Sequence, residues 1–174
     1  MRTRVGIGKR IPADLAAMAT LMAMLVAVLM ILGRPVTGTE VDKNAASPAQ
    51  AFRQWVPAAL AGDPAAQFEL GQAYADGAGT VEDMAEAAHW YKMAADQGSA
   101  RAQRDLAILY NKGLGVPQDY VQAYVWFDLA AVRFGTGRRY DQAMEMRNMM
   151  AAFLTPEQLT EAKRLSEEWQ TKSE

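Results

Sequence analysis

Two glycine pairs are the first candidates for chemistry, because a Gly-x-Gly turn can present backbone N–H groups to a phosphate. The pairs are Gly77 with Gly79 and Gly113 with Gly115. Each follows a stretch with the apolar spacing of a helix rather than a strand, and no Lys-Ser or Lys-Thr pair comes after it. We therefore interpret both pairs as turns that end a helix.

The chain offers few groups for acid–base or nucleophilic catalysis. His89 is the only histidine and there is no cysteine. This composition excludes relays built from several imidazoles, thiol nucleophiles and cysteine-based metal centres. Glu82 with Asp83 and Glu167 with Glu168 are pairs of carboxylates of the kind that glycosidases use. Their positions favour the start of a helix and a solvated helix face instead.

Methionines and tryptophans are the other side chains that either bind a ligand or fill the core. Thioether groups bind copper(I), and four methionines lie close together in the sequence. They are Met144, Met146, Met149 and Met150. Methionine is more often core filler, and Trp90 and Trp126 recur at a fixed spacing that favours helix packing over sugar stacking. We predict no catalytic residue, no cofactor and no metal, and therefore a protein that is not an enzyme.

A repeat of 36 residues organises the chain between residues 66 and 131. Displacing the sequence by 36 positions aligns alanines, glycines, aspartates and aromatic residues along one whole unit. The positions that we expect to be structural are Leu70, Gly71, Tyr74, Gly77, Gly79, Asp83, Trp90 and Tyr91 in the first unit, and Leu106, Tyr110, Gly113, Gly115, Asp119, Trp126 and Phe127 in the second.

Each unit has the pattern of two helices joined by a turn. Apolar residues at i, i+4 and i+8 mark one face of the first helix, and the glycines end it. Asp83 with Glu86, and Asp119 with Gln122, predict capping boxes at the start of the second helix. A hairpin of two helices cannot bury its apolar face alone, so neighbouring units must stack.

The flanking segments are predicted to complete an all-α fold of about seven helices. Capping boxes that contain proline begin at Ser47 and at Thr155, and each opens a helix. We divide this part of the chain into a partial repeat helix at 47–62, a first repeat at 63–98, a second repeat at 99–135 and C-terminal capping helices at 136–174.

The N-terminus carries the pattern of a membrane segment. Residues 15–33 are uncharged and nearly all apolar, and as a helix they would extend about 28 Å, close to the ~30 Å hydrocarbon core. The basic residues before them favour an N-terminus that stays in the cytoplasm. Residues 1–33 are therefore either a signal anchor, which we favour because no A-x-A site follows, or a cleaved signal peptide. Residues 34–46 lack periodicity and are expected to form a flexible linker.

The two units resemble Sel1-like repeats, a relative of the tetratricopeptide repeat. The resemblance rests on the pattern A-x-x-x-L-G-x-x-Y-x-x-G-x-G at 66–79 and on a second copy over 102–131. The second copy departs from the pattern at Ala107, where glycine is usual. The resemblance implies a short α-solenoid of helix hairpins, here preceded by an N-terminal hydrophobic helix, of a type found in the bacterial envelope.

The same resemblance implies a concave groove lined by the first helix of each unit. Side chains between the core positions would face it, and arginines beside apolar groups would suit a peptide with an acidic or carboxylate feature. The predicted lining residues are Phe68, Gln72, Arg101, Arg104, Ile108 and Asn111.

These observations predict a non-enzymatic protein–protein interaction module, an adaptor, scaffold or regulator in the bacterial cell envelope. Its partner would be an unidentified protein or peptide, and it would sit on the inner membrane facing the periplasm, or be soluble there if residues 1–33 are removed. The formal net charge is −2, residues 1–34 are net positive, and the rest of the chain is therefore acidic, which argues against nucleic-acid binding. The alternatives are a protein that binds glycan or peptidoglycan, with or without hydrolase activity, and a structural subunit of a homo-oligomer.

Overall fold

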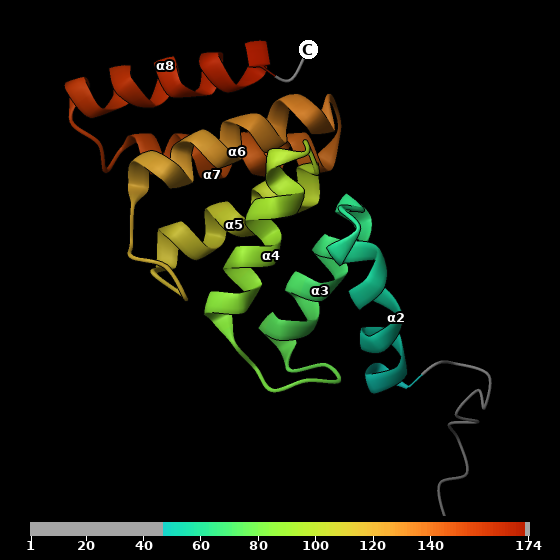
Figure 1. The fold of residues 1–174 in the computed structure, drawn as a ribbon. Helices are drawn as coiled ribbons and strands as arrows, with labels where there is room; N and C mark the ends of the chain where they lie inside the picture. The colour runs from blue at the N-terminus through green and yellow to red at the C-terminus, as the bar shows by residue number, and fades with distance from the viewer. Residues whose placement is uncertain (1–46, 173–174) are drawn as a thin grey trace, which may run out of the picture. The chain divides into compact units, whose positions relative to one another are not determined.

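A computed structural model describes residues 47–172 of the chain, and these residues form seven α-helices. The helices are α2 (Pro48–Leu60), α3 (Pro64–Asp76), α4 (Met84–Asp96), α5 (Ala100–Lys112), α6 (Tyr120–Phe134), α7 (Arg138–Ala151) and α8 (Pro156–Lys172). Each helix from α2 to α6 packs on the next one, and α8 packs on α6 (Figure 1). The predicted anchor or signal peptide (1–33) and linker (34–46) lie outside the described residues. None of the described helices has the length and hydropathy to cross a bilayer.

The two predicted repeats form helix hairpins with matching ends. The α3–α4 and α5–α6 hairpins begin 36 residues apart, and the glycines at 77 and 113 end the first helix of each in left-handed conformations with φ of 65° and 67°. The structural positions predicted from the repeat include the main core side chains: Leu70, Leu106, Trp126 and Phe127 are each no more than 1% exposed. Tyr91 is 4% exposed and belongs with Leu106, Trp126 and Phe127 to one cluster of buried side chains, which we call the main cluster. Tyr74 and Tyr110 are half-buried at the edge of the main cluster.

The helix caps differ between the repeats and the flanks. Asp83 Oδ1 accepts hydrogen bonds from the backbone N–H groups of Ala85 and Glu86, as predicted. The reciprocal half of the predicted box is absent, because the backbone N–H of Asp83 donates to Tyr74 O at 2.9 Å. The backbone N–H of Asp119 likewise donates to a backbone carbonyl, that of Tyr110, and not to a side chain. The long turn of each unit therefore folds back onto its own first helix and satisfies the donor that a Glu or Gln side chain would otherwise reach.

Within residues 47–172, complete capping boxes form only at the two flanks. The backbone N–H of Ser47 donates to the side chain of Gln50 at 2.8 Å, and the backbone N–H of Gln50 donates to the side chain of Ser47 at 3.3 Å. The same two hydrogen bonds join Thr155 and Gln158 at 3.0 and 3.2 Å. α8 begins after a segment without the Gly-x-Gly turn, and the backbone N–H of Thr155 donates to the side chain of Gln158 in place of a turn carbonyl.

Successive units are joined by backbone contacts at loop glycines. A Cβ atom on Gly115 would lie 2.1 Å from the backbone oxygen of Met84, at the start of α4. A Cβ atom on Gly79 would lie 2.4 Å from the backbone oxygen of Pro48, at the start of α2. Both glycines also have positive φ, so only glycine satisfies the conformation and the close approach together.

Buried glutamines form a second link between units. Gln103 Nε2 donates to Ala95 O at 3.1 Å, and Gln67 Nε2 donates to Ala59 O at 3.2 Å. Both glutamines are at most 4% exposed. Because these bonds also repeat at 36 residues, α2 is the second helix of an incomplete preceding unit, in which Trp55 matches Tyr91 rather than Trp90.

The C-terminal helices complete the core and are tied to α6 by a polar cluster. Met150 of α7 and Ala162 of α8 are buried in the main cluster with the repeat residues. Asp128 of α6 pairs with Arg147 of α7 at 2.8 Å and accepts a hydrogen bond from the buried hydroxyl of Ser166 on α8. One carboxylate therefore holds two helices that pack on different parts of α6.

We expect Gly115→Ala to destabilise the fold by about 3 kcal/mol or more, since the added Cβ atom would overlap a backbone carbonyl as well as strain a positive φ. Gly77→Ala is the matched control. Its Cβ atom would meet nothing closer than 3.4 Å, and only the left-handed conformation should cost about 1–2 kcal/mol. Urea unfolding followed by circular dichroism measures both, and equal losses would contradict the backbone contact as the cause.

Candidate functional site

Five of the six predicted groove residues are exposed or half-buried on α3 and α5. We call this set the Arg101 face and define it as Gln72, Arg101, Arg104, Ile108 and Asn111. Gln72 and Arg101 are exposed, whereas the other three are half-buried. The backbone carbonyl of Asn111 accepts a hydrogen bond from Gln118 Nε2 at 2.7 Å, so this end of the face is held by the turn that follows α5.

The prediction that Phe68 lines the groove was wrong. Phe68 is 3% exposed and belongs to the main core cluster. Its ring centroid lies 5.7 Å from that of Tyr91 on α4. The helical pattern placed Phe68 between the core positions of α3, but α3 packs on both α2 and α4 and buries more than one stripe of its surface.

Arg101 covers the outer side of Phe68 and links the first helices of the two repeats. The centre of its guanidinium group lies 4.4 Å from the centroid of the Phe68 ring. Its Nη2 atom lies 3.7 Å from Glu69 Oε1 on α3, and about half of the Arg101 side chain remains exposed. Stacking on an aromatic ring restrains the guanidinium plane, while the long ion pair leaves most of its N–H donors facing solvent.

Arg104 is bound more tightly within the fold. Its guanidinium group lies 2.7 Å from the carboxylate of Asp105, and that hydrogen bond raises the pKa of Arg104. The same carboxylate acts on Tyr91 of α4. Burial, and secondarily the negative charge of Asp105, raise the pKa of the Tyr91 phenol well above its ordinary value. Arg104 is therefore engaged with its neighbour, and Arg101 is the cation of this face that has the weaker internal partner.

The remaining sequence candidates do not assemble into a site. His89 is exposed and its ring meets the edge of Trp90 at 5.6 Å between centroids. Asp83 caps α4 and Glu168 pairs with Arg164, whereas Glu82 and Glu167 are exposed.

Among the four methionines, Met150 is buried in the main core, Met149 is 47% exposed, and Met144 and Met146 pack in different clusters. No cluster of His, Cys, Asp or Glu suited to a metal ion occurs within residues 47–172.

The two tryptophans pack between helices, as predicted. Trp126 is 1% exposed in the main cluster, and Trp90 is half-buried against the cluster that contains Leu70. The indole N–H of each is enclosed without a hydrogen-bond partner. A ring of Trp126 is thus not available for stacking on a sugar.

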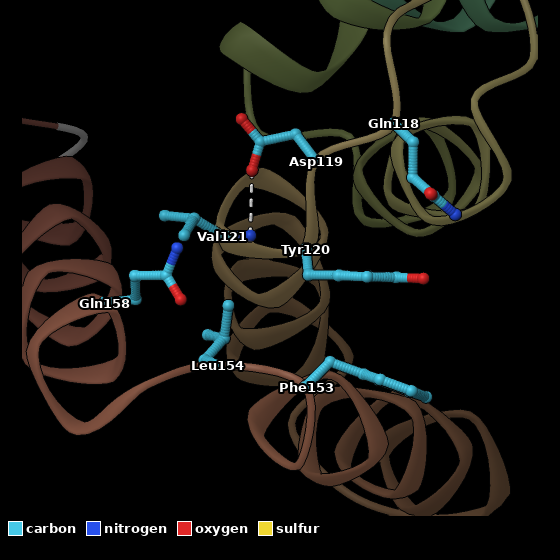
Figure 2. Close-up of a pocket in the computed structure, with 7 residues that line it drawn as sticks. All are labelled: Gln118, Asp119, Tyr120, Val121, Phe153, Leu154 and Gln158. Carbon is cyan, nitrogen blue, oxygen red and sulfur yellow. Dashed lines mark hydrogen bonds between the residues drawn. The ribbon is translucent and has the colours of Figure 1, made fainter.

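A pocket of about 380 Å³ at the start of α6 was not predicted from the sequence. It is lined by the end of the turn before α6, by the first residues of α6 and by the connection from α7 to α8 (Figure 2). The rings of Tyr120 and Phe153 stack at 4.8 Å along one side, and Gln158 approaches from α8. The 36-residue repeat contains the signal for this pocket. Residues 148–155 align with the glycine turn 112–119 but contain no glycine.

Stacked helix hairpins that repeat in this way define an α-solenoid. The two complete hairpins are Sel1 repeats: the Sel1 repeat model matches residues 64–99 and 100–131, which confirms the resemblance of the motifs. Proteins with this fold typically serve as protein–protein interaction modules.

Two solved structures are similar to the chain. One is a protective antigen of uropathogenic Escherichia coli strains that displays an SLR fold, with 36% sequence identity, a TM-score of 0.65, and coverage of 87% of this chain and 29% of the antigen. The other is a Sel1 repeat protein from Oxalobacter formigenes, with 32% identity, a TM-score of 0.49, and coverage of 49% of this chain and 25% of that protein. The chain thus spans less than a third of either relative. No curated protein matches the sequence.

The raised pKa of Tyr91 predicts a loss of stability in alkali. The unfolded chain releases this proton near pH 10, whereas the folded chain retains it. Stability is therefore intact below pH 10 and falls as the pH rises further, by up to about 1.4 kcal/mol per pH unit for this group. Tyr91→Phe should reduce the slope of unfolding free energy between pH 10 and 11.5 relative to the parent chain. Equal slopes would show that Tyr91 ionises as readily in the folded state.

Proposed function

We propose that the chain binds a polypeptide segment on the Arg101 face and that a carboxylate of this segment is recognised by Arg101. The observation that carries the proposal is the state of Arg101, stacked on Phe68 at 4.4 Å and only loosely paired with Glu69 at 3.7 Å. A strong charge-assisted bond is about 2.7–2.9 Å long. A carboxylate from a partner would therefore form a better pair than the one within the fold.

Pre-organisation supports this choice of residue. Arginine loses considerable side-chain freedom when it binds, and the stacked geometry has already removed part of that freedom. Arg104 is already paired with Asp105 at 2.7 Å, so it would contribute mainly to the shape of the binding surface. Exposed Gln72 and half-buried Ile108 add an amide and an apolar contact on the same face.

A photo-crosslinker placed at position 72 of the full chain tests the proposal in bacterial cells. We expect it to capture a discrete polypeptide whose yield falls at least about tenfold in Arg101→Gln, which corresponds to the loss of roughly 1.4 kcal/mol of binding free energy. Glu69→Gln is the matched control: it removes the competing carboxylate and leaves Arg101 stacked, so the yield should stay the same or rise. A crosslinker at exposed His89 on α4 reports labelling that does not depend on the face.

Two results would contradict this function. One is a product at position 72 that survives Arg101→Gln. The other is a set of products that is the same at position 89 as at position 72.

We also propose that the module acts in the bacterial cell envelope, tethered to the inner membrane and facing the periplasm. The support is the apolar run 15–33 with basic residues before it. Mass spectrometry of the protein recovered from envelope fractions should find an intact N-terminus. A mature chain that begins after about residue 38, in the soluble periplasmic fraction, would replace the tether with a cleaved signal peptide.

A further inference from the structure

The pocket at the start of α6 occupies a defined place in the repeat. Tyr120 is the first residue of α6, and it corresponds to Met84 in α4 and to Pro48 in α2 at successive spacings of 36 residues. At the two earlier positions a loop glycine contacts the helix backbone, whereas the third position lines a pocket of about 380 Å³ (Figure 2).

A glycine turn packs against the helix backbone at both of the earlier positions. Gly79 sits against the backbone of Pro48 and Ala49, and Gly115 sits against the backbone of Met84 and Ala85. In each case the turn belongs to the following unit, and the absence of a side chain allows backbone to meet backbone. At the starts of α2 and α4, a glycine turn of the following unit therefore packs against the helix backbone, and we call this position at the start of a second helix the socket.

The unit after α6 has no such turn. Its residues 148–155 read NMMAAFLT, where the preceding unit reads KGLGVPQD, so Met149 and Ala151 stand at the glycine positions. Without glycine the first helix continues, and α7 ends only at Ala151. Phe153 then reaches over and stacks on Tyr120, covering one side of the socket and leaving the other side open.

The open side combines apolar walls with unused amide groups. Val121 and Leu154 lie beside Gln158 in the close-up of the pocket, and Gln118 lies on the other side of Tyr120 (Figure 2). Gln118 uses its Nε2 atom to bond Asn111 O, and Gln158 uses its Oε1 atom to bond the backbone of Thr155. The Oε1 atom of Gln118 and the Nε2 atom of Gln158 have no partner among the described residues, so one acceptor and one donor remain for a peptide backbone.

We propose that this pocket receives a glycine-containing turn from a separate polypeptide, which continues the stack in the way that each unit continues the one before. The pocket continues the interface between units, which accepts such a turn twice within this chain. A second copy of the chain is not the source, because both Gly-x-Gly turns within residues 47–172 are already seated on their own preceding units. This surface is distinct from the Arg101 face, and the proposal does not depend on the function of that face.

Nuclear magnetic resonance of the full chain in detergent micelles tests the proposal with a cyclised peptide of sequence KGLGVPQD. We expect it to shift the amide signals of Val121 and Phe153. A peptide in which the glycine equivalent to Gly115 is alanine should bind at least about tenfold more weakly, because its Cβ atom would meet the backbone of Tyr120. Arg101→Gln should leave the binding of both peptides unchanged, which separates this test from that of the Arg101 face.

A graft provides a second measurement. Replacing residues 148–155 with KGLGVPQD should seat the turn within the chain, and the grafted protein should lose the response of Val121 to the cyclic peptide.

Four results would overturn the proposal. They are the absence of shifts at Val121 and Phe153, equal binding of the glycine and alanine peptides, unchanged binding to a folded graft, and shifts produced by N-acetylglucosamine oligomers but not by the peptide.

Discussion

The close approach of a loop glycine to the backbone of the preceding unit is the constraint on which the rest of the structure depends. Gly115 against Met84 and Gly79 against Pro48 set the distance between successive units, and no residue with a Cβ atom permits it. Once that distance is set, the amides of Gln67 and Gln103 reach the carbonyls of Ala59 and Ala95 in the same way. The small residues of the second helices then allow the close packing that buries Leu70, Leu106 and Phe127.

The C-terminal unit lacks this glycine contact and is held together in another way. Its second helix begins at the expected spacing, because the capping box of Thr155 and Gln158 is a local signal. The segment before it has no glycine, and α7 therefore runs further and lacks the long turn. In place of the turn, the fold uses Asp128 to bind Arg147 and Ser166, and this single carboxylate on α6 holds both C-terminal helices. The result is a stable end that differs from the repeats and leaves a socket uncovered.

Features encoded by neighbouring residues could be predicted from the sequence, and features that depend on the distance between helices could not. The helix starts at Asp83 and Asp119, the glycine ends and the 36-residue period all follow from local spacing. The burial of Phe68 depends on how α3 is enclosed by α2 and α4, and one helical pattern does not contain that information. The pairs of Arg101 with Glu69 and of Arg104 with Asp105 were likewise missed, because an exposed position predicts a charge in solvent and says nothing of its partner.

Internal charge pairing determines how the Arg101 face would select a partner. Glu69 and Asp105 oppose the two arginines, so the face presents little net charge and steers acidic chains only weakly from a distance. The choice of partner would then depend on the geometry of the contact with Arg101. A carboxylate that reaches Arg101 at hydrogen-bond distance replaces a 3.7 Å ion pair with a shorter one, while Glu69 returns to water at little cost because its side chain is already 31% exposed. A neutral segment would gain no such exchange. The proposed face therefore discriminates by the placement of one carboxylate and not by the overall charge of the partner, as expected for a domain whose own formal charge is negative.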